Sequence, residues 1–189
     1  MLARLLTPAE YGIMAMIAIF IAVSNSIVDS GFSNALIRKV RVERVDYNTV
    51  FYFNLAVSVL LYVLLFLASP SISVFFKEPE LVKVTRVIGS VLVINALAII
   101  PRTVFVRDVN FKTQTKVSLI SSVSSGAVGI VMALSGMGVW SLVGQQLSRQ
   151  SLNSLFLWVY CKWKPSLEFS IESFRELFGF GSKLLLSGL

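Results

Sequence analysis

Long apolar segments alternate with short polar ones along almost the whole chain. A helix rises about 1.5 Å per residue, so about 20 apolar residues cross a bilayer core that is about 30 Å thick. We therefore predict an all-α fold, a polytopic bundle of transmembrane helices. The predicted spans are residues 12–29, 50–69, 82–106, 117–134 and 138–161.

Proline, glycine and serine mark several boundaries and contacts of these spans. Pro70 is predicted to end the second span, because proline interrupts the helical hydrogen bonds. Pro101 lies near the far end of the third span, where a kink is tolerated. The fourth span is rich in serine and glycine, which favours close approach of a neighbouring helix. A tight turn over residues 135–138 leads directly into the fifth span.

Residues 166–180 follow another pattern, with apolar and charged side chains on different faces of one predicted helix. Ser170 can cap its start and Gly179 fits its end. Such a helix can lie in the cytoplasmic interface of the membrane, or it can pack on the protein as an ordinary loop helix. Residues 181–189 are apolar again and are predicted to begin a further, truncated helix. The apolar face consists of Ile171, Phe174, Leu177 and Phe178.

The composition agrees with a membrane protein. Of the 189 residues, 56% are hydrophobic and 14% charged, whereas soluble domains are about a quarter charged. The net charge of +7 does not indicate nucleic-acid binding, because the basic residues fall between apolar segments and not along one face. With no histidine and only Cys161, the sequence offers no internal disulfide and no cysteine-based metal cluster. We expect no catalytic residues, no metal and no cofactor.

The distribution of lysine and arginine predicts the orientation, because these residues accumulate in cytoplasmic loops. Twelve lie in one set of alternating polar segments, which we assign to the cytoplasm, and four lie in the other set. This places Met1 outside, with no preceding span to carry it there. We therefore expect the chain to be a piece that lacks one helix before Met1 and more after Leu189. The cytoplasmic set is Arg38, Lys39, Arg41, Arg44, Arg102, Arg107, Lys112, Lys116, Lys162, Lys164, Arg175 and Lys183; the other set is Arg4, Lys77, Lys83 and Arg86.

The fifth span carries a charge at its middle. Arg149 lies nine residues from both Trp140 and Trp158, aromatic residues of the kind that anchor at membrane interfaces. Arginine at a helix centre costs roughly 2.5–3.5 kcal/mol on the mildest scale, so it normally faces a bundle interior or an aqueous cavity. The alternative is that Arg149 only pairs with a neighbouring carbonyl or carboxylate. The predicted cavity-lining stripe is Ser141, Gln145, Arg149 and Asn153, with Gln146 beside it.

Other spans contribute polar residues at membrane depth. Asn25 and Asp29 lie one helical turn apart in the first span, Asn54 lies in the second and Asn95 in the third. Each alone is more often a helix–helix hydrogen bond than a ligand site. Together with Arg149 they predict a polar, cationic interior that suits a hydrophilic anion, such as a diphosphate that carries a sugar chain.

Four segments resemble one family of transporters. They are RLLTPAEYG (4–12), DSGFSNALIRK (29–39), RTVFVRDVNFK (102–112) and GVWSLVGQQLSRQ (138–150). In combination they are similar to the O-antigen and capsule polysaccharide flippases of the multidrug/oligosaccharidyl-lipid/polysaccharide exporter superfamily. The resemblance covers essentially the whole chain.

The resemblance implies two lobes of transmembrane helices around a central cavity in a bacterial plasma membrane. It implies that undecaprenyl-diphosphate-linked oligosaccharide moves from the cytoplasmic to the periplasmic leaflet by alternating access, with the polysaccharide polymerase machinery as a candidate partner. Family members place cations in the cavity for the diphosphate, and Arg149 matches such a position. By this resemblance, the chain is expected to lack the family's first helix and nearly all of its second lobe.

Three alternatives to a flippase remain open. A multidrug cation antiporter of the same superfamily would need an acidic cavity, whereas the charge at mid-membrane is Arg149. A membrane enzyme of polysaccharide assembly would need a sizeable outer loop, and the predicted outer loops are short. An inactive remnant is also compatible with the sequence. For a flippase driven by an ion gradient, Asp29 is the candidate coupling residue, because it is the one acid predicted at membrane depth.

Overall fold

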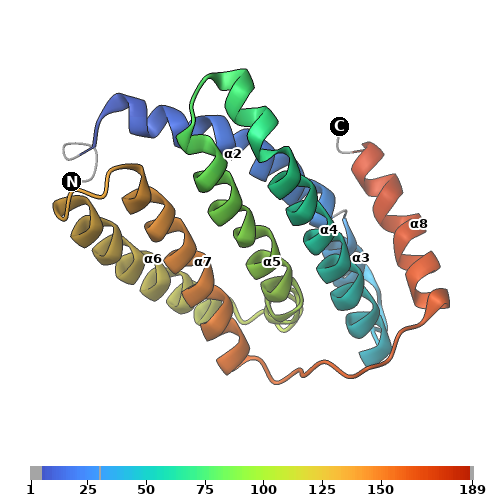
Figure 1. Ribbon diagram of the computed structural model, residues 1–189. Coiled ribbons are helices and arrows are strands. Elements are labelled where there is room, and N and C mark those ends of the chain that lie inside the picture. The colour runs from blue at the N-terminus through green and yellow to red at the C-terminus, as the bar shows by residue number, and fades with distance from the viewer. Residues whose placement is uncertain (1–5, 30, 188–189) are drawn as a thin grey trace.

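The computed structural model describes residues 6–29 and 31–187, with side chains described up to residue 179. Within this part, every regular element is a helix, as predicted. Apart from the short α3, the helices are long enough to extend along much of the bundle (Figure 1). Their bounds are α2 (Pro8–Asp29), α3 (Phe32–Arg38), α4 (Arg44–Phe76), α5 (Glu80–Arg107), α6 (Phe111–Leu134), α7 (Val139–Tyr160) and α8 (Ile171–Ser187).

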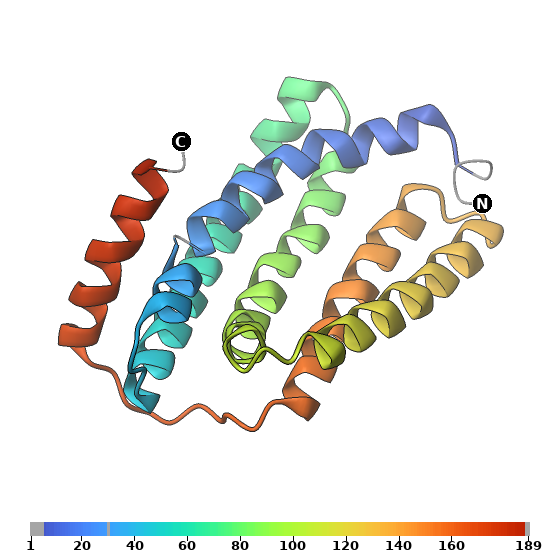
Figure 2. The ribbon, with the colours of Figure 1, turned by 180° about the vertical axis from the view of Figure 1, so that it is seen from behind.

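Helix α5 is the centre of the arrangement and packs against α4, α7 and α2. The antiparallel pair α6 and α7 forms one edge, and α8 forms the opposite edge beside α3 and α4 (Figure 1). Seen from behind, α2 crosses the near side of the bundle (Figure 2). The bundle therefore has two layers of helices, with α2 lying over α4 and α5.

Four of the five predicted spans belong to helices that are long and apolar enough to cross a membrane. These are α2 together with α3, α4, α5 and α6, and each extends beyond its predicted bounds. Helix α7 begins and ends within one residue of the prediction, but it is too polar to be counted with the other four. That α7 also crosses the membrane stays a prediction.

The prediction that Pro70 ends the second helix was wrong, because α4 continues through it to Phe76. Proline has no N–H, so the carbonyl of Phe66 loses its usual donor four residues later. The hydroxyl of Ser69 donates to this carbonyl at 2.8 Å and itself accepts a hydrogen bond of 3.0 Å from Arg86 Nε. The helix survives because a neighbouring hydroxyl replaces the missing donor, as is common for membrane helices.

The small residues of α6 allow the close contact with α7 that the sequence predicts. A methyl group added at Gly129 would lie 3.0 Å from Cβ of Gln145, and one added at Gly144 would lie 2.3 Å from Sδ of Met132. Ser121 and Ser125 of α6 are also fully buried. Small residues let two backbones approach closely, and van der Waals packing then holds the pair together in lipid.

The buried apolar residues form two clusters, one toward each end of the bundle. One contains Ile17, Leu92 and Val143, and the other contains Leu36 and Leu157 with neighbours on several helices. Polar side chains occupy the level between the clusters on four helices. These are Asn25 of α2, Asn54 of α4, Asn95 of α5 and Gln150 of α7.

The predicted basic segments gather at one end of the bundle, the lower end in Figure 1. Arg107, in the last turn of α5, donates to the carbonyls of Leu36 and Lys39 at the end of α3, at 2.8 Å for Lys39. Lys39 Nζ in turn contacts Asp46 at 3.1 Å and Glu176 at 2.8 Å. Burial alone would lower the pKa of Lys39, but these two carboxylates outweigh it and raise the pKa. The lysine therefore keeps its charge at neutral pH, and its part in these contacts is lost as the pH rises through that raised pKa.

Helix α8 differs from the two predicted segments, because one helix replaces the amphipathic helix 166–180 and the apolar run 181–189. Ser170 caps it as predicted, since its Oγ accepts from the backbone N–H of Ser173 at 3.2 Å. Gly179 does not end it; the backbone stays helical to Ser187, and residues 188–189 lie outside the described residues. Leu177 is buried and Phe174 stacks near Phe32 of α3, so this part of the apolar face packs on protein, whereas Ile171 and Phe178 remain exposed. A location at the membrane interface stays a prediction.

Candidate functional site

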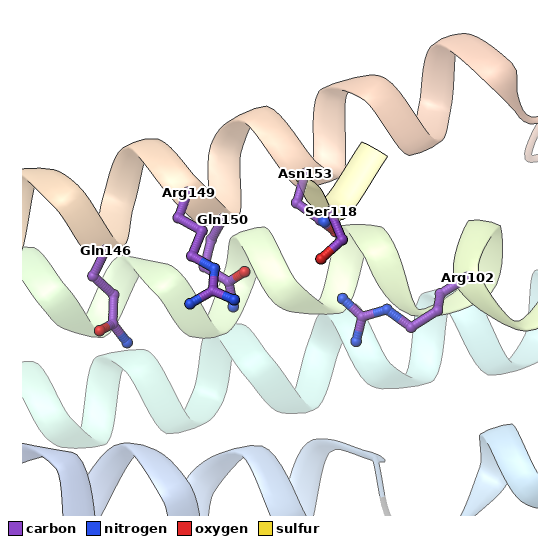
Figure 3. Close-up of a pocket in the computed structure, with 6 residues that line it drawn as sticks. All are labelled: Arg102, Ser118, Gln146, Arg149, Gln150 and Asn153. Atoms are coloured by element: carbon purple, nitrogen blue, oxygen red, sulfur yellow. The ribbon is translucent and has the colours of Figure 1, made fainter. Parts of the chain in front are cut away.

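A polar hollow of about 260 Å³ lies between α5, α6 and α7 (Figure 3). Two arginines enter it from different helices, Arg149 from α7 and Arg102 from α5. The remaining lining is of neutral polar side chains that can donate and accept hydrogen bonds. The lining residues are Arg102, Ser118, Gln146, Arg149, Gln150 and Asn153.

The rotation of α7 explains which of its predicted residues reach the hollow. A helix turns about 100° per residue, so positions four apart drift by about 40° and positions twelve apart by about 120°. Gln146, Arg149, Gln150 and Asn153 fall within about 100° of one another and form one face. A strict four-residue stripe that starts at Ser141 cannot stay on that face.

Two residues of the predicted stripe therefore point elsewhere. Ser141 is fully buried, and its hydroxyl donates to the carbonyl of Gly138 at 2.6 Å. Gln145 is turned toward α6, where its side chain lies against Gly129. The prediction that these two residues line the cavity with Arg149 does not match their placement, whereas the placement of Arg149, Asn153 and Gln146 does.

The sequence analysis missed three lining residues. Arg102 was counted with the loop charges, although it falls inside the predicted third span (82–106), and α5 continues through Pro101 to Arg107. Gln150 was passed over because it is not four residues from Arg149. Ser118 carried no recognisable signal, since α6 contains many serines. The signal for Arg102 was its position inside the predicted apolar span.

The two guanidinium groups give the hollow its electrostatic character. Within the described chain, neither Arg149 nor Arg102 forms an ion pair, and no carboxylate lines the hollow. The charge of Asp29 attracts Arg102 from the end of α2, but Asp29 itself is exposed and accepts a hydrogen bond of 2.6 Å from Ser33. Two cations without a bound counter-charge favour an anionic ligand, which arginine can hold with two parallel hydrogen bonds.

A chain of amides connects the floor of the hollow to α2. Gln150 Nε2 donates to Asn95 Oδ1 at 2.6 Å, and Asn95 Nδ2 donates to Asn25 Oδ1 at 3.1 Å. The predicted residue Asn25 thus belongs to the interior through Asn95, and it lines a second hollow of about 230 Å³ that shares Gln146 with the first. These hydrogen bonds fix the α7 face against α5 and α2.

Asn54, the fourth polar residue at this level, does not join the amide chain. It is fully buried in α4, and neither its amide nitrogen nor its carbonyl oxygen has a hydrogen-bond partner among the described residues. Within the same part of the chain, no group of three histidine, cysteine or acidic side chains could hold a metal ion.

The fold and the hollow define a class of protein: a helix bundle of the membrane with a cationic, amide-lined interior. The chain belongs to the polysaccharide biosynthesis protein family, which it matches over residues 1–189. It is therefore a multi-pass protein of the bacterial plasma membrane. The family predicted from the four sequence segments is confirmed.

Curated relatives agree with this assignment. The chain is 28% identical over 86% of its length to the teichuronic acid biosynthesis protein TuaB of Bacillus subtilis, and 25% identical over 95% to the succinoglycan biosynthesis transport protein ExoT of Rhizobium meliloti. It is 22% identical over 97% to the lipopolysaccharide biosynthesis protein WzxC of Escherichia coli. The chain spans between 34% and 38% of the length of these relatives. No solved structure matches it significantly.

Proposed function

We propose that this chain forms part of a flippase for lipid-linked oligosaccharides. The substrate is a polyprenyl diphosphate that carries a sugar chain, and it crosses from the cytoplasmic to the outer leaflet by alternating access. Arg149 and Arg102 bind the diphosphate, while Gln146, Gln150 and Asn153 accept and donate hydrogen bonds around it. The observation that carries the proposal is the pair of arginines in one polar hollow that no carboxylate lines.

The position of the hollow supports this role. Arg149 lies at the polar level between the two apolar clusters, and Arg102 lies closer to the basic end of the bundle. If the basic end faces the cytoplasm, a diphosphate from the cytoplasmic leaflet meets Arg102 first and Arg149 at mid-depth. A fixed cation at that depth offsets part of the cost of moving an anion through a low-dielectric region.

The relatives' names support the substrate class, since they concern the synthesis of teichuronic acid, succinoglycan and lipopolysaccharide, and ExoT is called a transport protein. A multidrug cation antiporter is less compatible with a hollow that holds two guanidinium groups. Asp29 stays the proposed coupling residue, and the polymerase machinery stays a proposed partner.

A transport assay tests the proposal directly. The intact protein is reconstituted into liposomes that contain a fluorescent polyprenyl-diphosphate oligosaccharide, and a membrane-impermeant quencher reports how much probe changes leaflet. We expect faster exchange than in protein-free liposomes. A monophosphate analogue should move more slowly, because it offers fewer charges to two arginines. Exchange no faster than in protein-free liposomes would reject the flippase, and transport of a lipophilic cation in its place would favour the multidrug alternative.

The orientation is tested by cysteine labelling. In a Cys161→Ser background, we expect Lys77→Cys to react with a membrane-impermeant maleimide from outside the cell, because Lys77 lies at the end of the bundle opposite the basic segments. Arg41→Cys is the matched control and should react only in inverted vesicles. Reaction of Lys77→Cys only from the cytoplasmic side would reverse the proposed topology.

A further inference from the structure

Helix α5 contains a break in its hydrogen bonding that another helix repairs. Pro101 lies inside α5 and has no N–H, so the carbonyl of Leu97 loses the donor that a helix normally supplies four residues later. The indole Nε1 of Trp158, on α7, donates to this carbonyl at 3.0 Å. A buried carbonyl without a partner is costly in a membrane, so this bond replaces the one that Pro101 removes.

The proline of α4 shows that such a repair does not require a second helix. There the freed carbonyl of Phe66 is satisfied by Ser69 of the same helix. At Pro101 the donor comes instead from α7, the helix that also carries Arg149. The two arginine-bearing helices are therefore joined by a hydrogen bond next to Pro101.

The segment beyond the kink carries the second arginine of the hollow. Arg102 directly follows Pro101, and Arg107 fixes the end of the same segment to the carbonyls at the end of α3. Proline is one of the main causes of sharp helix kinks, and in membrane helices a neighbouring helix can satisfy the backbone group that the proline frees. The contacts of Trp158 and Arg107 thus hold the segment from Arg102 to Arg107 at both of its ends.

We propose that Trp158 is a positioning residue: its indole N–H sets the angle of the Pro101 kink and thereby places Arg102 in the hollow beside Arg149. This inference rests on the proposed diphosphate site. It also explains why Trp158 does not act simply as an interfacial anchor, because its N–H is used inside the bundle. Its ring contributes separately, through an edge contact with Phe51 at 6.0 Å between centroids and a tilted one with Trp163 at 5.8 Å.

A double-mutant cycle isolates the role of the N–H. Trp158→Phe keeps an aromatic ring beside Phe51 but leaves the Leu97 carbonyl without a donor. Pro101→Ala restores a backbone N–H at position 101, which can donate to Leu97 in place of the indole. We expect Trp158→Phe to be harmful with Pro101 present and nearly silent in the Pro101→Ala background, because the two changes act on one carbonyl.

Two readouts are taken on the intact protein. Spin labels at Arg44→Cys and Asp108→Cys, both exposed near the basic end, report the direction of the end of α5 relative to α4 without any ligand. Binding of farnesyl diphosphate, a short prenyl diphosphate, reports the site. With Trp158→Phe we expect a broadened distance distribution and about tenfold weaker binding, the order of the loss of one hydrogen bond to a charged group. The pair Pro101→Ala and Pro101→Ala/Trp158→Phe should be alike in both readouts.

The control is Trp140→Phe, the same substitution on the same helix, at a tryptophan whose indole N–H bonds to no residue in the described part of the chain. It should change neither readout. An unchanged distance distribution in Trp158→Phe, or equal losses with Pro101 present and in the Pro101→Ala background, would overturn the positioning role. A third outcome separates the two proposals. If Trp158→Phe broadens the distance distribution while neither Trp158→Phe nor Arg149→Ala weakens farnesyl diphosphate binding, the positioning role is supported and the proposed diphosphate site is rejected.

Discussion

Replacing Arg149 by alanine is expected to abolish surface polysaccharide in a complementation assay while the protein remains in the membrane. The side chain is exposed to the polar hollow and forms no ion pair with any residue in the described ranges 6–29 and 31–179. Its loss therefore leaves no buried partner unsatisfied, and it removes an insertion cost of roughly 2.5–3.5 kcal/mol. Folding should not suffer, whereas the diphosphate loses the cation at mid-depth.

Arg149→Lys separates charge from geometry. Lysine keeps the positive charge but cannot form two parallel hydrogen bonds with a phosphate, so partial activity is expected. Arg102→Ala should also lower transport, because it removes the other guanidinium of the hollow. The matched control is Arg175→Ala, an exposed arginine on α8 that does not line the hollow; it should leave polysaccharide unchanged.

A membrane-expression blot decides between a binding role and a structural one. Lost polysaccharide with normal protein abundance would support binding by Arg149. Lost polysaccharide together with lost protein would indicate that Arg149 mainly holds helices together. Normal polysaccharide from Arg149→Ala would reject its role in the proposed site.

The sequence predicted the positions of the helices well, because the length of an apolar segment largely determines whether it forms a membrane helix. A helix lies at each predicted span, and four of these helices are long and apolar enough to cross a membrane. The tight turn at residues 135–138 and the small-residue contact of α6 are also present. Errors arose where a tertiary contact overrode a local rule. Pro70 breaks an isolated helix, but Ser69 supplies the missing donor and Arg86 holds Ser69 in place. That interaction involves residues of two helices and cannot be read from either segment alone.

The lining of the hollow was predicted only in part for a geometric reason, and the binding role of these residues stays a prediction. Spacing by four identifies neighbours on a helix but drifts around it, so the stripe from Ser141 to Asn153 joined residues on different sides of α7. Arg149 and Asn153 were found, whereas Gln150 and Arg102 became visible only when α5 was packed against α7. The partner of Trp158 was equally hidden, because nothing in the sequence shows which donor reaches the Leu97 carbonyl.

The second large effect is expected at the turn between α6 and α7. Gly138 has φ 54° and ψ −131°, a backbone region that is open to glycine and strained for other residues. A methyl group here would also lie 2.5 Å from Oε1 of Glu10, whose carboxylate is held by the backbone N–H of Thr7 at 2.6 Å. Both effects act at the point where the start of α2 meets the α6–α7 pair.

We expect Gly138→Ala to destabilise the protein by roughly 1–3 kcal/mol from backbone strain alone, with the contact at Glu10 adding to it. Thermal unfolding can be followed by the reaction of a fluorogenic thiol reagent with Cys161, which is buried in the folded protein. Gly126→Ala is the control, because a methyl group there meets nothing within 4 Å. Glu10→Ala combined with Gly138→Ala should recover only the part due to the contact. If Gly138→Ala unfolds at the same temperature as Gly126→Ala, the turn does not need glycine and the proposed strain is wrong.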